Sequence, residues 1–396
     1  MKRKICVITA TRAEYGLLHW LLSELASEPM FDLQLVVSGA HLSSAYGLTW
    51  KEIEADGFHI NRKVDMALMS DTPAGISQSM GLALTGFVDA FEQLKPDLVV
   101  LLGDRYEILM AASAALLARI PIAHLHGGEL TQGAIDDSIR HAVTKMSHLH
   151  FVANNEYRRR VIQLGEVPAS VFTVGGLGLD NLARLKLLSR EALQADLAFE
   201  FQSKNLLITF HPTTLNKDQA AKEFGALLDA LEEQTDMGLL FTLPNADPES
   251  RVIVKMIDAF VAQHPHAKAW SSLGQLRYLS CMNAVNAVVG NSSSGILEAP
   301  SLKVGTINIG SRQDGRLKAS SIIDCPADRS AIAQALATLF STEFQSQLPT
   351  TVNPYGHPGA SERVMHVLRK VEFSQLLNKH FYDLPVPDMN VSRSKT

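Results

Sequence analysis

Three carboxyl side chains in this sequence have the spacing to form one proton-transfer group. Asp104 follows the apolar run LVVLLG, Glu129 follows IAHLHGG, and Asp136 opens a segment with helical character. Carboxyls that share a site raise one another's pKa, so that one can be a protonated acid while another is an ionised base. We therefore expect this acidic group to take a proton from a bound substrate and to return one.

Neighbouring residues extend this group but have alternative explanations. Asp136 and Arg140 are four residues apart and share one face of a helix. An N-cap aspartate with an ordinary i,i+4 ion pair explains the same spacing, and the two explanations carry equal weight. His124 and His126 pose a similar question, because each could transfer protons or could be a buried strand histidine.

A small-residue segment, Asn-Ser-Ser-Ser-Gly at 291–295, has the features of an anion-binding loop. Small residues let the backbone approach a ligand, and free N–H groups at a helix start favour negative charge. The hydroxyls of Ser292 and Ser293 add donors, although an ordinary serine N-cap is the alternative. Glu298 lies one turn further on, where it could accept hydrogen bonds from ribose hydroxyls or only stabilise the first turn of the helix.

Four candidate cations follow predicted strands: Arg12, Arg105, His211 and Arg312. Arginine suits phosphate because its guanidinium donates two parallel hydrogen bonds. Each cation alone is weak evidence, since arginine is common on protein surfaces. Together with the serine loop they predict a diphosphate ligand.

The elements that position these residues alternate between short apolar strands and longer helices. In the first half, strands are predicted at 4–10, 33–39, 97–103, 121–128, 149–154 and 171–176, and helices at 15–27, 74–93, 105–118, 136–147 and 155–164. In the second half, strands are predicted at 205–212, 238–245, 267–272, 287–293 and 306–310, and helices at 217–234, 249–264, 328–341 and 361–377. The strands are nearly continuous in apolar residues, which is typical of parallel strands covered by helices on both faces.

The fold class is therefore α/β, with two doubly wound Rossmann-like domains in tandem. We expect an N-terminal domain at 1–178 that carries the acidic group, a C-terminal nucleotide-binding domain at 179–360, a helix at 361–380 and a loose tail at 381–396. Open α/β sheets bind ligands outside the carboxyl ends of their strands, where these polar residues stand. The ligand site is predicted in a cleft between the domains.

Composition excludes several classes of function. A net charge of −5 gives no reason to expect nucleic acid or a membrane surface as a partner. The basic start is followed by an apolar run of only about seven residues, which favours a buried first strand over a signal peptide. The three cysteines have neither disulfide nor zinc spacing, so a cytoplasmic protein is expected. The GxGxxG and Walker patterns are absent, and no cofactor or metal is predicted.

Several motifs in a fixed order resemble one family. They are TRAEYG (11–16), LGDRYE (102–107), HLHGGE (124–129), DDSIRHAVTKMS (136–147), FHP (210–212), GNSSSG (290–295) with Glu298, and INIGSRQDGR (307–316). The chain resembles the hydrolysing UDP-N-acetylglucosamine 2-epimerases of sialic-acid and related nonulosonic-acid biosynthesis, and the bacterial capsule-type members most closely. The likeness extends from about residue 4 to 370.

The resemblance implies a glycosyltransferase-B-like fold, a C-terminal helix that returns to the first domain, and UDP held mainly by the second domain. The reaction it implies is elimination of UDP across C1–C2 to give a 2-acetamidoglucal, followed by addition of water. By position, residues expected to contact the nucleotide or diphosphate are Arg12, Arg105, His211, Asn245, Ser292, Ser293, Glu298 and Arg312. Those expected on the sugar side are Asp104, Glu129, Asp136, Arg140 and His126.

Two departures refine this assignment. The position of His126 is often glutamate in related enzymes, so Glu129 is expected to carry more of the acid–base role. The loop at 39–46 lacks the Gln-His residues typical of non-hydrolysing epimerases, which favours the hydrolysing branch.

Alternative functions remain open at this point. The first is the same reaction on UDP-2,4-diacetamido-2,4,6-trideoxyglucose, the legionaminic-acid precursor. The others are a glycosyltransferase of the same fold and a non-catalytic protein that binds UDP-sugars. A homo-oligomer, dimer or tetramer, is the default expectation for such enzymes.

Overall fold

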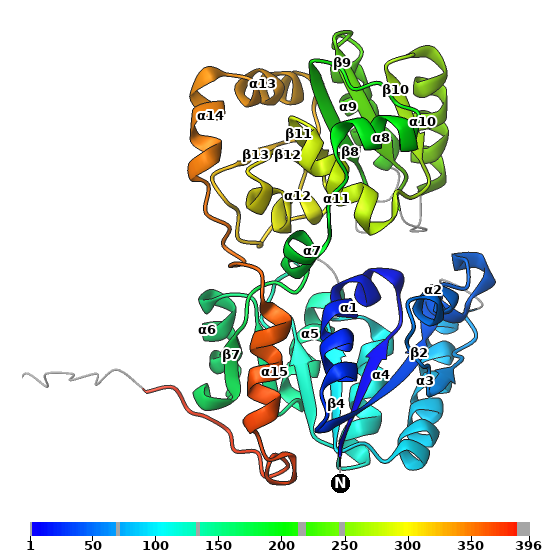
Figure 1. Ribbon diagram of the computed structural model, residues 1–396, viewed down its shortest axis with the longest axis vertical. Helices are drawn as coiled ribbons and strands as arrows, with labels where there is room; N and C mark the ends of the chain where they lie inside the picture. The colour runs from blue at the N-terminus through cyan, green and yellow to red at the C-terminus, as the bar shows by residue number, and fades with distance from the viewer. Residues whose placement is uncertain (1, 69–71, 132–134, 213–218, 245–249, 386–396) are drawn as a thin grey trace, which may run out of the picture.

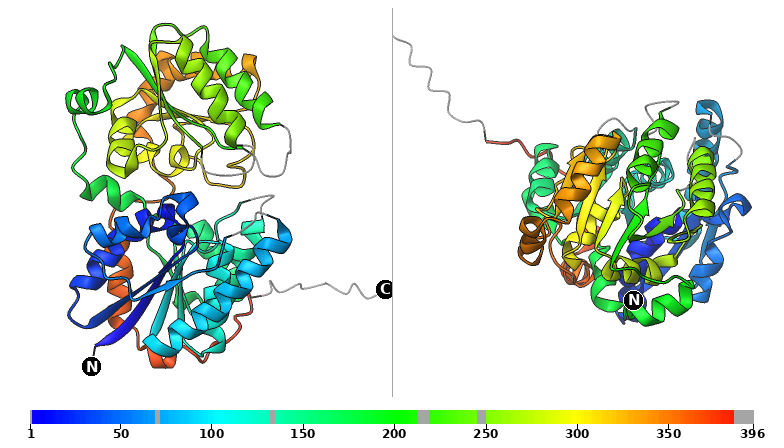
Figure 2. Two further views of the ribbon diagram at one scale, coloured as in Figure 1. Left: turned by 90° about the vertical axis from the view of Figure 1, so that its right-hand side faces the viewer. Right: turned by 90° about the horizontal axis from the view of Figure 1, so that it is seen from above.

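Two α/β domains lie one above the other along the long axis of the molecule (Figure 1). The structure is a computed structural model that describes residues 2–68, 72–131, 135–212, 219–244 and 250–385. In each domain a parallel sheet lies between layers of helices (Figure 2). The predicted fold class, two doubly wound Rossmann-like units, is confirmed.

The first domain contains a seven-stranded sheet in the order β3-β2-β1-β4-β5-β6-β7. All neighbouring strands in it are parallel. The strands are β1 (Arg3–Thr9), β2 (Phe31–Ser38), β3 (Arg62–Val64), β4 (Leu98–Leu102), β5 (Ile122–Leu125), β6 (Leu149–Val152) and β7 (Val171–Thr173). The strand order reverses between β1 and β4, which is where ligands bind in open α/β sheets.

The second domain contains a six-stranded sheet in the order β10-β9-β8-β11-β12-β13. It is parallel as well. The strands are β8 (Lys204–Thr209), β9 (Met237–Thr242), β10 (Ala267–Trp270), β11 (Ala287–Gly290), β12 (Gly305–Ile309) and β13 (Ile322–Cys325). Here the order reverses between β8 and β11.

Helices connect the strands. In the first domain they are α1 (Arg12–Ser27), α2 (Trp50–Ala55), α3 (Pro73–Leu94), α4 (Tyr106–Leu117), α5 (Ile135–Met146) and α6 (Asn155–Gln163). From the linker onward they are α7 (Leu179–Arg184), α8 (Arg190–Leu197), α9 (Ala220–Leu231), α10 (Ser250–Gln263), α11 (Gly274–Ala284), α12 (Ser294–Leu297), α13 (Arg329–Leu339), α14 (Thr342–Gln347) and α15 (Ala360–Lys370). Among the residues that the structure describes, none of these helices combines the length and apolar content needed to cross a membrane.

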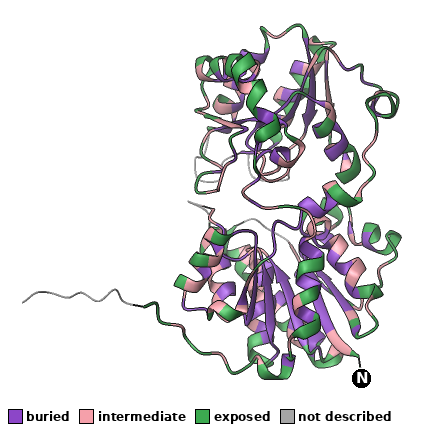
Figure 3. Ribbon diagram, turned by 60° about the vertical axis from the view of Figure 1, so that its left-hand side comes forward, coloured by how far each residue is buried: buried purple, intermediate pink, exposed green. Residues whose placement is uncertain are grey.

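Burial on both faces explains the continuous apolar strands. In β4, Leu98 and Val100 join the core beneath α1, whereas Val99 and Leu101 join the core beneath α3 and α4. Successive strand side chains point to opposite faces, so a sheet covered on both sides needs an apolar residue at every position. Strands β4, β5 and β11 are accordingly buried along their whole length (Figure 3).

The prediction misses two strands, β3 and β13, and five helices, α2, α7, α8, α11 and α14. β3 is three residues long and exposed over two of them, so it has no apolar run to detect. β13 is only partly buried, as expected of an edge strand. The predicted helix at 361–377 is too long, because α15 ends at Lys370, where Val371 has an extended backbone.

The two segments that connect the domains are tied together by one carboxylate. Asp180 of α7 is fully buried and accepts hydrogen bonds from the backbone N–H groups of Gly359, Ala360 and Ser361 at 2.6, 2.9 and 2.8 Å. These are the free donors at the start of α15, which a negative charge stabilises. α15 then packs on α1 of the first domain, and Val364 contributes to the shared core (Figure 1).

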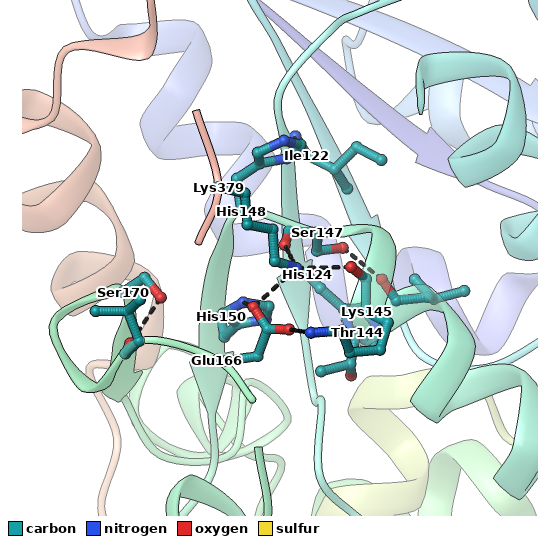
Figure 4. A network of polar contacts seen from close by, with 12 residues as sticks. Ile122, His124, Thr144, Lys145, Ser147, His148, His150, Glu166, Ser170 and Lys379 are labelled. Atoms are coloured by element: carbon teal, nitrogen blue, oxygen red, sulfur yellow. Dashed lines mark hydrogen bonds and ion pairs between the residues drawn. The ribbon is translucent and has the colours of Figure 1, made fainter. Parts of the chain in front are cut away.

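Beyond α15 the chain is anchored beneath the first sheet. The ammonium of Lys379 donates to the carbonyls of Lys145 and Ser147, both at 2.6 Å, and forms an ion pair with Glu166 at 2.8 Å (Figure 4). Glu166 also accepts from His150 at 2.9 Å and from Lys145 at 2.6 Å. Part of the segment expected to be a loose tail is therefore held in place, since Tyr382 also bonds the carbonyl of Gly165; residues 386–396 lie outside the described part.

Candidate active site between the two domains

The carboxyl ends of the two sheets meet across the domain boundary. Arg12, which follows β1, donates to the hydroxyl of Ser272, which follows β10, at 2.9 Å. Gln275 of α11 donates to the carbonyl of Gly16 in α1 at 3.3 Å. The loops that carry the predicted site residues thus face one another. A ligand shared by the two domains would bind here, because doubly wound sheets bind ligands outside the carboxyl ends of their strands.

On the first domain, Asp104 and Arg140 form the central contact. Asp104 follows β4, and its carboxylate accepts a hydrogen bond from Arg140 of α5. Arg140 is buried and also donates to the hydroxyl of Thr131 at 3.2 Å. The ion-pair partner of Arg140 is therefore Asp104, across the loops, and not Asp136 on the same helix. The expected i,i+4 pair between Asp136 and Arg140 is not among the ion pairs of the described residues.

The environment of Asp104 favours its protonated form. Burial raises the pKa of Asp104, the charge of Arg140 opposes that rise, and the nearby carboxyls of Asp136 and Glu129 add to it. Asp136 and Glu129 therefore lie close enough to Asp104 to act on its carboxyl. The structure brings them together at the ends of β4 and β5 and the start of α5.

Glu129 differs from Asp104 because its partner is an imidazole, whereas that of Asp104 is a guanidinium. Burial would raise the pKa of Glu129, but the charge and hydrogen bond of His126 outweigh it and lower the pKa to about 2. Oε1 of Glu129 lies 2.8 Å from Nδ1 of His126, and Nε2 of His126 accepts from the backbone N–H of Leu177 at 3.4 Å. The expectation that these carboxyls all raise one another's pKa is wrong for Glu129.

The two histidines of the HLHGGE motif are placed differently. His124 is fully buried in β5, where its ring nitrogens lie 2.8 Å from the Gly103 carbonyl and 3.1 Å from the Thr144 hydroxyl. Burial lowers the pKa of His124 to about 3, which is typical of a neutral structural histidine. His126 lies in the loop after β5, beside Glu129, and so belongs to the candidate site.

On the second domain, Asn291 holds three strand ends together. Its side-chain oxygen accepts from the backbone N–H of His211 at 2.7 Å, and its amide donates to the His211 carbonyl at 2.8 Å. Its own carbonyl accepts from Arg312 at 3.0 Å and from Gln313 at 2.8 Å. Burial and the charge of Arg312 lower the pKa of His211 to about 3, so a neutral imidazole stands beside the arginine.

The serine loop starts from a position that only glycine can occupy. Gly290 has φ +131°, and a Cβ there would lie 2.0 Å from the carbonyl oxygen of Thr209. Beyond it, the hydroxyl of Ser292 lies 2.9 Å from that of Ser294, which is 2.5 Å from the phenol of Tyr278. Because α12 is only four residues long, its dipole is small, and anion binding there depends on these hydroxyls and local N–H groups. Tyr278 lies in α11, and no sequence motif marks it.

Glu298 lies against the segment that joins the domains. A Cβ on Gly178 would come within 2.7 Å of Glu298 Oε1, so the glutamate carboxyl lies directly against the linker. Burial raises the pKa of Glu298 to about 8, and the charge of Arg316 opposes that rise. The sequence alone assigned no role to Arg316 of the INIGSRQDGR motif, but its charge acts on Asp104, Glu129 and Glu298.

Two arginines that were predicted to bind the diphosphate already have partners within the protein. Arg105 lies 3.2 Å from Glu107, which is fully buried, and its charge also opposes the rise in the pKa of Glu14 that burial causes. Arg12 lies 3.6 Å from Glu52 besides its bond to Ser272. Ser293 precedes α12 without a side-chain capping bond. Asn245 lies outside the described residues.

The fold and these two facing surfaces define a class of protein. Two parallel α/β domains place carboxyls on one surface, and hydroxyls, an imidazole and an arginine on the other. This is the arrangement of the glycosyltransferase-B-like enzymes that handle nucleotide sugars. A family model described as UDP-N-acetylglucosamine 2-epimerase matches residues 23–369.

The chain belongs to the UDP-N-acetylglucosamine 2-epimerase family. It is 43% identical over 97% of its length to the whole of a GDP/UDP-N,N'-diacetylbacillosamine 2-epimerase (hydrolyzing) of Campylobacter jejuni. It is 37% identical over 97% of its length to 98% of polysialic acid biosynthesis protein P7 of Escherichia coli. The resemblance inferred from the motifs is confirmed, and the chain is an enzyme of this family.

Solved structures agree with the fold. The S. aureus MnaA–UDP complex superposes with a TM-score of 0.79 and 19% identity over 97% of this chain and 100% of that one. At that identity the match concerns the fold alone.

Proposed function

We propose that this protein is a hydrolysing nucleotide-sugar 2-epimerase whose preferred substrate is UDP-2,4-diacetamido-2,4,6-trideoxyglucose. This sugar is diacetylbacillosamine, which appears in the name of the Campylobacter jejuni relative. The reaction would release UDP and the free sugar inverted at C2. The observation that carries the reaction is the pair of contacts at the ends of β4 and β5, Asp104 with Arg140 and Glu129 with His126, because carboxyls in different surroundings take different proton-transfer roles. The name of the Campylobacter jejuni relative supports the choice of sugar.

The first half of the reaction is an elimination. The C2–H bond is a very weak acid, so the C1–O bond must break substantially as the proton leaves, and its electron pair goes to the diphosphate. Asp104 is the proposed proton acceptor, because a carboxylate whose pKa is raised is the stronger base and Arg140 holds it in place. Glu129 stays ionised and holds the ring of His126.

The second half adds water across the C1=C2 bond of the 2-acetamidoglucal. Hydroxide is added at C1, and a proton reaches C2 on the face opposite the one it left. Asp136, which opens α5 beside Asp104, is the group positioned to supply that proton. The proton that water loses as its hydroxide bonds to C1 restores Asp136, and the proton taken by Asp104 passes to solvent. On the other surface, Arg312, His211 and the serine loop would bind the diphosphate. Preorganised donors of this kind are usually the largest single term in catalysis.

The second candidate substrate is UDP-N-acetylglucosamine, the sugar nucleotide that gives the family its name. The two sugars differ at C4 and C6, so the same proton-transfer groups serve both. Because the Campylobacter relative's name includes GDP as well as UDP, the GDP-linked diacetamido sugar belongs in the same comparison.

NMR in D₂O tests the proposal. The protein is incubated separately with each sugar nucleotide and without any acceptor. We expect free sugar of inverted C2 configuration, deuterated at C2, with the highest kcat/KM for the diacetamido sugar. If no nucleotide is released from any of them unless an acceptor is present, the protein is a glycosyltransferase; if all are bound and left intact, it is a binding protein.

A further inference from the structure

We infer that Arg316 is a substrate-contacting residue that binds the oxygen leaving with UDP, at the junction between the sugar and the diphosphate. The inference rests on the proposed function and adds a contact that the sequence motifs do not assign. Two observations carry it. The residues next to Arg316 pack where the two domains meet, and one nitrogen of its guanidinium has no hydrogen-bond partner among the described residues.

Residues on either side of Arg316 contact the second domain, and one of them also packs where the two domains meet. On one side, Gln313 donates to the carbonyl of Asn291 in the second domain at 2.8 Å and accepts from the backbone N–H of Arg316 at 3.3 Å. On the other side, Leu317 packs against an apolar cluster that contains Tyr157 of α6 and Tyr355 of the second connecting segment. The phenol oxygens of Tyr157 and Tyr355 lie 3.1 Å apart. Arg316 therefore stands where the second domain reaches over to the first.

The positive charge of Arg316 acts on carboxyls of both surfaces. Burial is the main influence on the pKa values of Asp104, Glu129 and Glu298, and Arg316 lowers each of them. The first two belong to the sugar side, and Glu298 belongs to the nucleotide side. A cation that acts on the carboxyls of both sides lies between them, where the bond from the sugar to the diphosphate is expected.

One nitrogen of the Arg316 guanidinium is available to donate a hydrogen bond to a ligand. Its Nη1 is buried and has no hydrogen-bond partner among the residues that the structure describes. A buried N–H without an acceptor is unfavourable, so its presence points to a ligand that supplies one. Arg312, three residues past β12, already donates to the carbonyl of Asn291.

These observations fit the leaving oxygen better than any other part of the substrate. The charge that forms as the C1–O bond breaks develops on that oxygen, between the carboxyls that act at C2 and the loops that hold the phosphates. A fixed cation there stabilises the transition state more than the intact sugar nucleotide. The terminal phosphate of free UDP carries the same charge, so Arg316 should also favour UDP over UMP.

The test compares Arg316→Met, Arg316→Lys and the control Lys318→Met. Lys318 is two residues away and lies 2.7 Å from Asp324, so its replacement removes a neighbouring charge that faces elsewhere. Affinities for UMP and UDP are measured by calorimetry, UDP release is measured with each sugar nucleotide, and thermal unfolding is recorded for every variant. For Arg316→Met we expect unchanged UMP affinity, UDP affinity about 10- to 100-fold lower and turnover at least about 100-fold lower.

Arg316→Lys keeps the charge and should recover part of the preference for UDP, and Lys318→Met should match the wild type throughout. An unchanged ratio of UDP to UMP affinity in Arg316→Met overturns the inference, as does an equal loss of both nucleotides. If Arg316→Met does not fold, Arg316→Lys decides: a UDP to UMP ratio below that of Lys318→Met supports the contact, and an equal ratio overturns it. The proposed function is tested by a different result: it fails if the wild type releases UDP from none of the sugar nucleotides. The ratio of UDP to UMP affinity can still be measured in that case.

Discussion

Asp104 and Glu129 follow neighbouring strands of the first sheet, and their surroundings shift the pKa values of their carboxyls in opposite directions. Asp104 is buried beside two other carboxyls, whereas Glu129 faces the imidazole of His126 at 2.8 Å. The difference gives two carboxyls of one site different tasks in proton transfer.

Replacing Asp104 by asparagine should lower turnover by at least about 100-fold, because the side chain can no longer accept the C2 proton. UDP affinity should change little, since Asp104 stands on the sugar side. Kinetics with the best sugar nucleotide and calorimetry with UDP measure the two effects. Asp89→Asn on the exposed surface of α3 is the control. Wild-type turnover in Asp104→Asn contradicts its role as the base.

Replacing Asp136 by asparagine should also lower turnover by at least about 100-fold with little loss of UDP binding. The reason differs, since Asp136 is proposed to act when the proton returns to C2. The variant should therefore release UDP and accumulate the glucal, which NMR detects directly. Unchanged turnover would remove Asp136 from the mechanism.

The activity should depend on pH with a limb on the acid side. Asp104 must be ionised to accept a proton, and its pKa is raised by burial. Activity should therefore fall as the pH drops through a value above the ordinary aspartate pKa of about 3.9. A profile of kcat against pH measures the midpoint. The residual activity of Asp104→Asn should lack this limb, and an identical limb in that variant would assign it to another group.

Arg312→Ala should weaken UDP binding by about tenfold or more, because a charge-assisted hydrogen bond to phosphate is lost. The variant also loses the bond from Arg312 to the carbonyl of Asn291, so thermal unfolding is measured alongside. Arg329→Ala, whose partner Glu233 is exposed, serves as the control. A UDP dissociation constant equal to that of the wild type counts against the assignment.

The buried histidines should contribute less to the free energy of unfolding as the pH falls below about 6.5. Burial lowers the pKa of His41 to about 4 and that of His124 to about 3, whereas unfolded histidine titrates near 6.5. Between these values the unfolded chain binds more protons at these two residues than the folded chain does, so their contribution to stability is lost as the pH falls. Glu14 and Glu298, whose pKa values burial raises to about 8, change stability in the opposite direction over the same range. Urea unfolding of the wild type and of His41→Gln at pH 7.5 and 5 therefore isolates the contribution of one histidine. The free energy of unfolding at pH 7.5 minus that at pH 5 should be more positive in the wild type, and an equal pH dependence in the two proteins would contradict the prediction.

The strands and the positions of the candidate residues could be predicted, but their partners could not. Continuous apolar runs reveal strands buried on both faces, and polar residues directly after them mark the carboxyl ends of the sheets. The pairing of Arg140 with Asp104 joins residues 36 positions apart, whereas i,i+4 spacing suggested Asp136. Arg316 stood inside a quoted motif, but its importance depends on Leu317 packing against the other domain, which no local pattern records.

Asp180 determines how the two halves of the molecule can move apart. Both connecting segments are bound to this one carboxylate, the first through α7 and the second through the start of α15. α7 and α15 also contact α1, the first through the 2.7 Å hydrogen bond from Trp20 to Asn181 and the second through its packing, so these bonds hold both connecting segments on the first domain. Any opening that admits a sugar nucleotide should therefore bend the chain just beyond α7 and just before α15, with the polar contact of Arg12 and Ser272 as the part that separates.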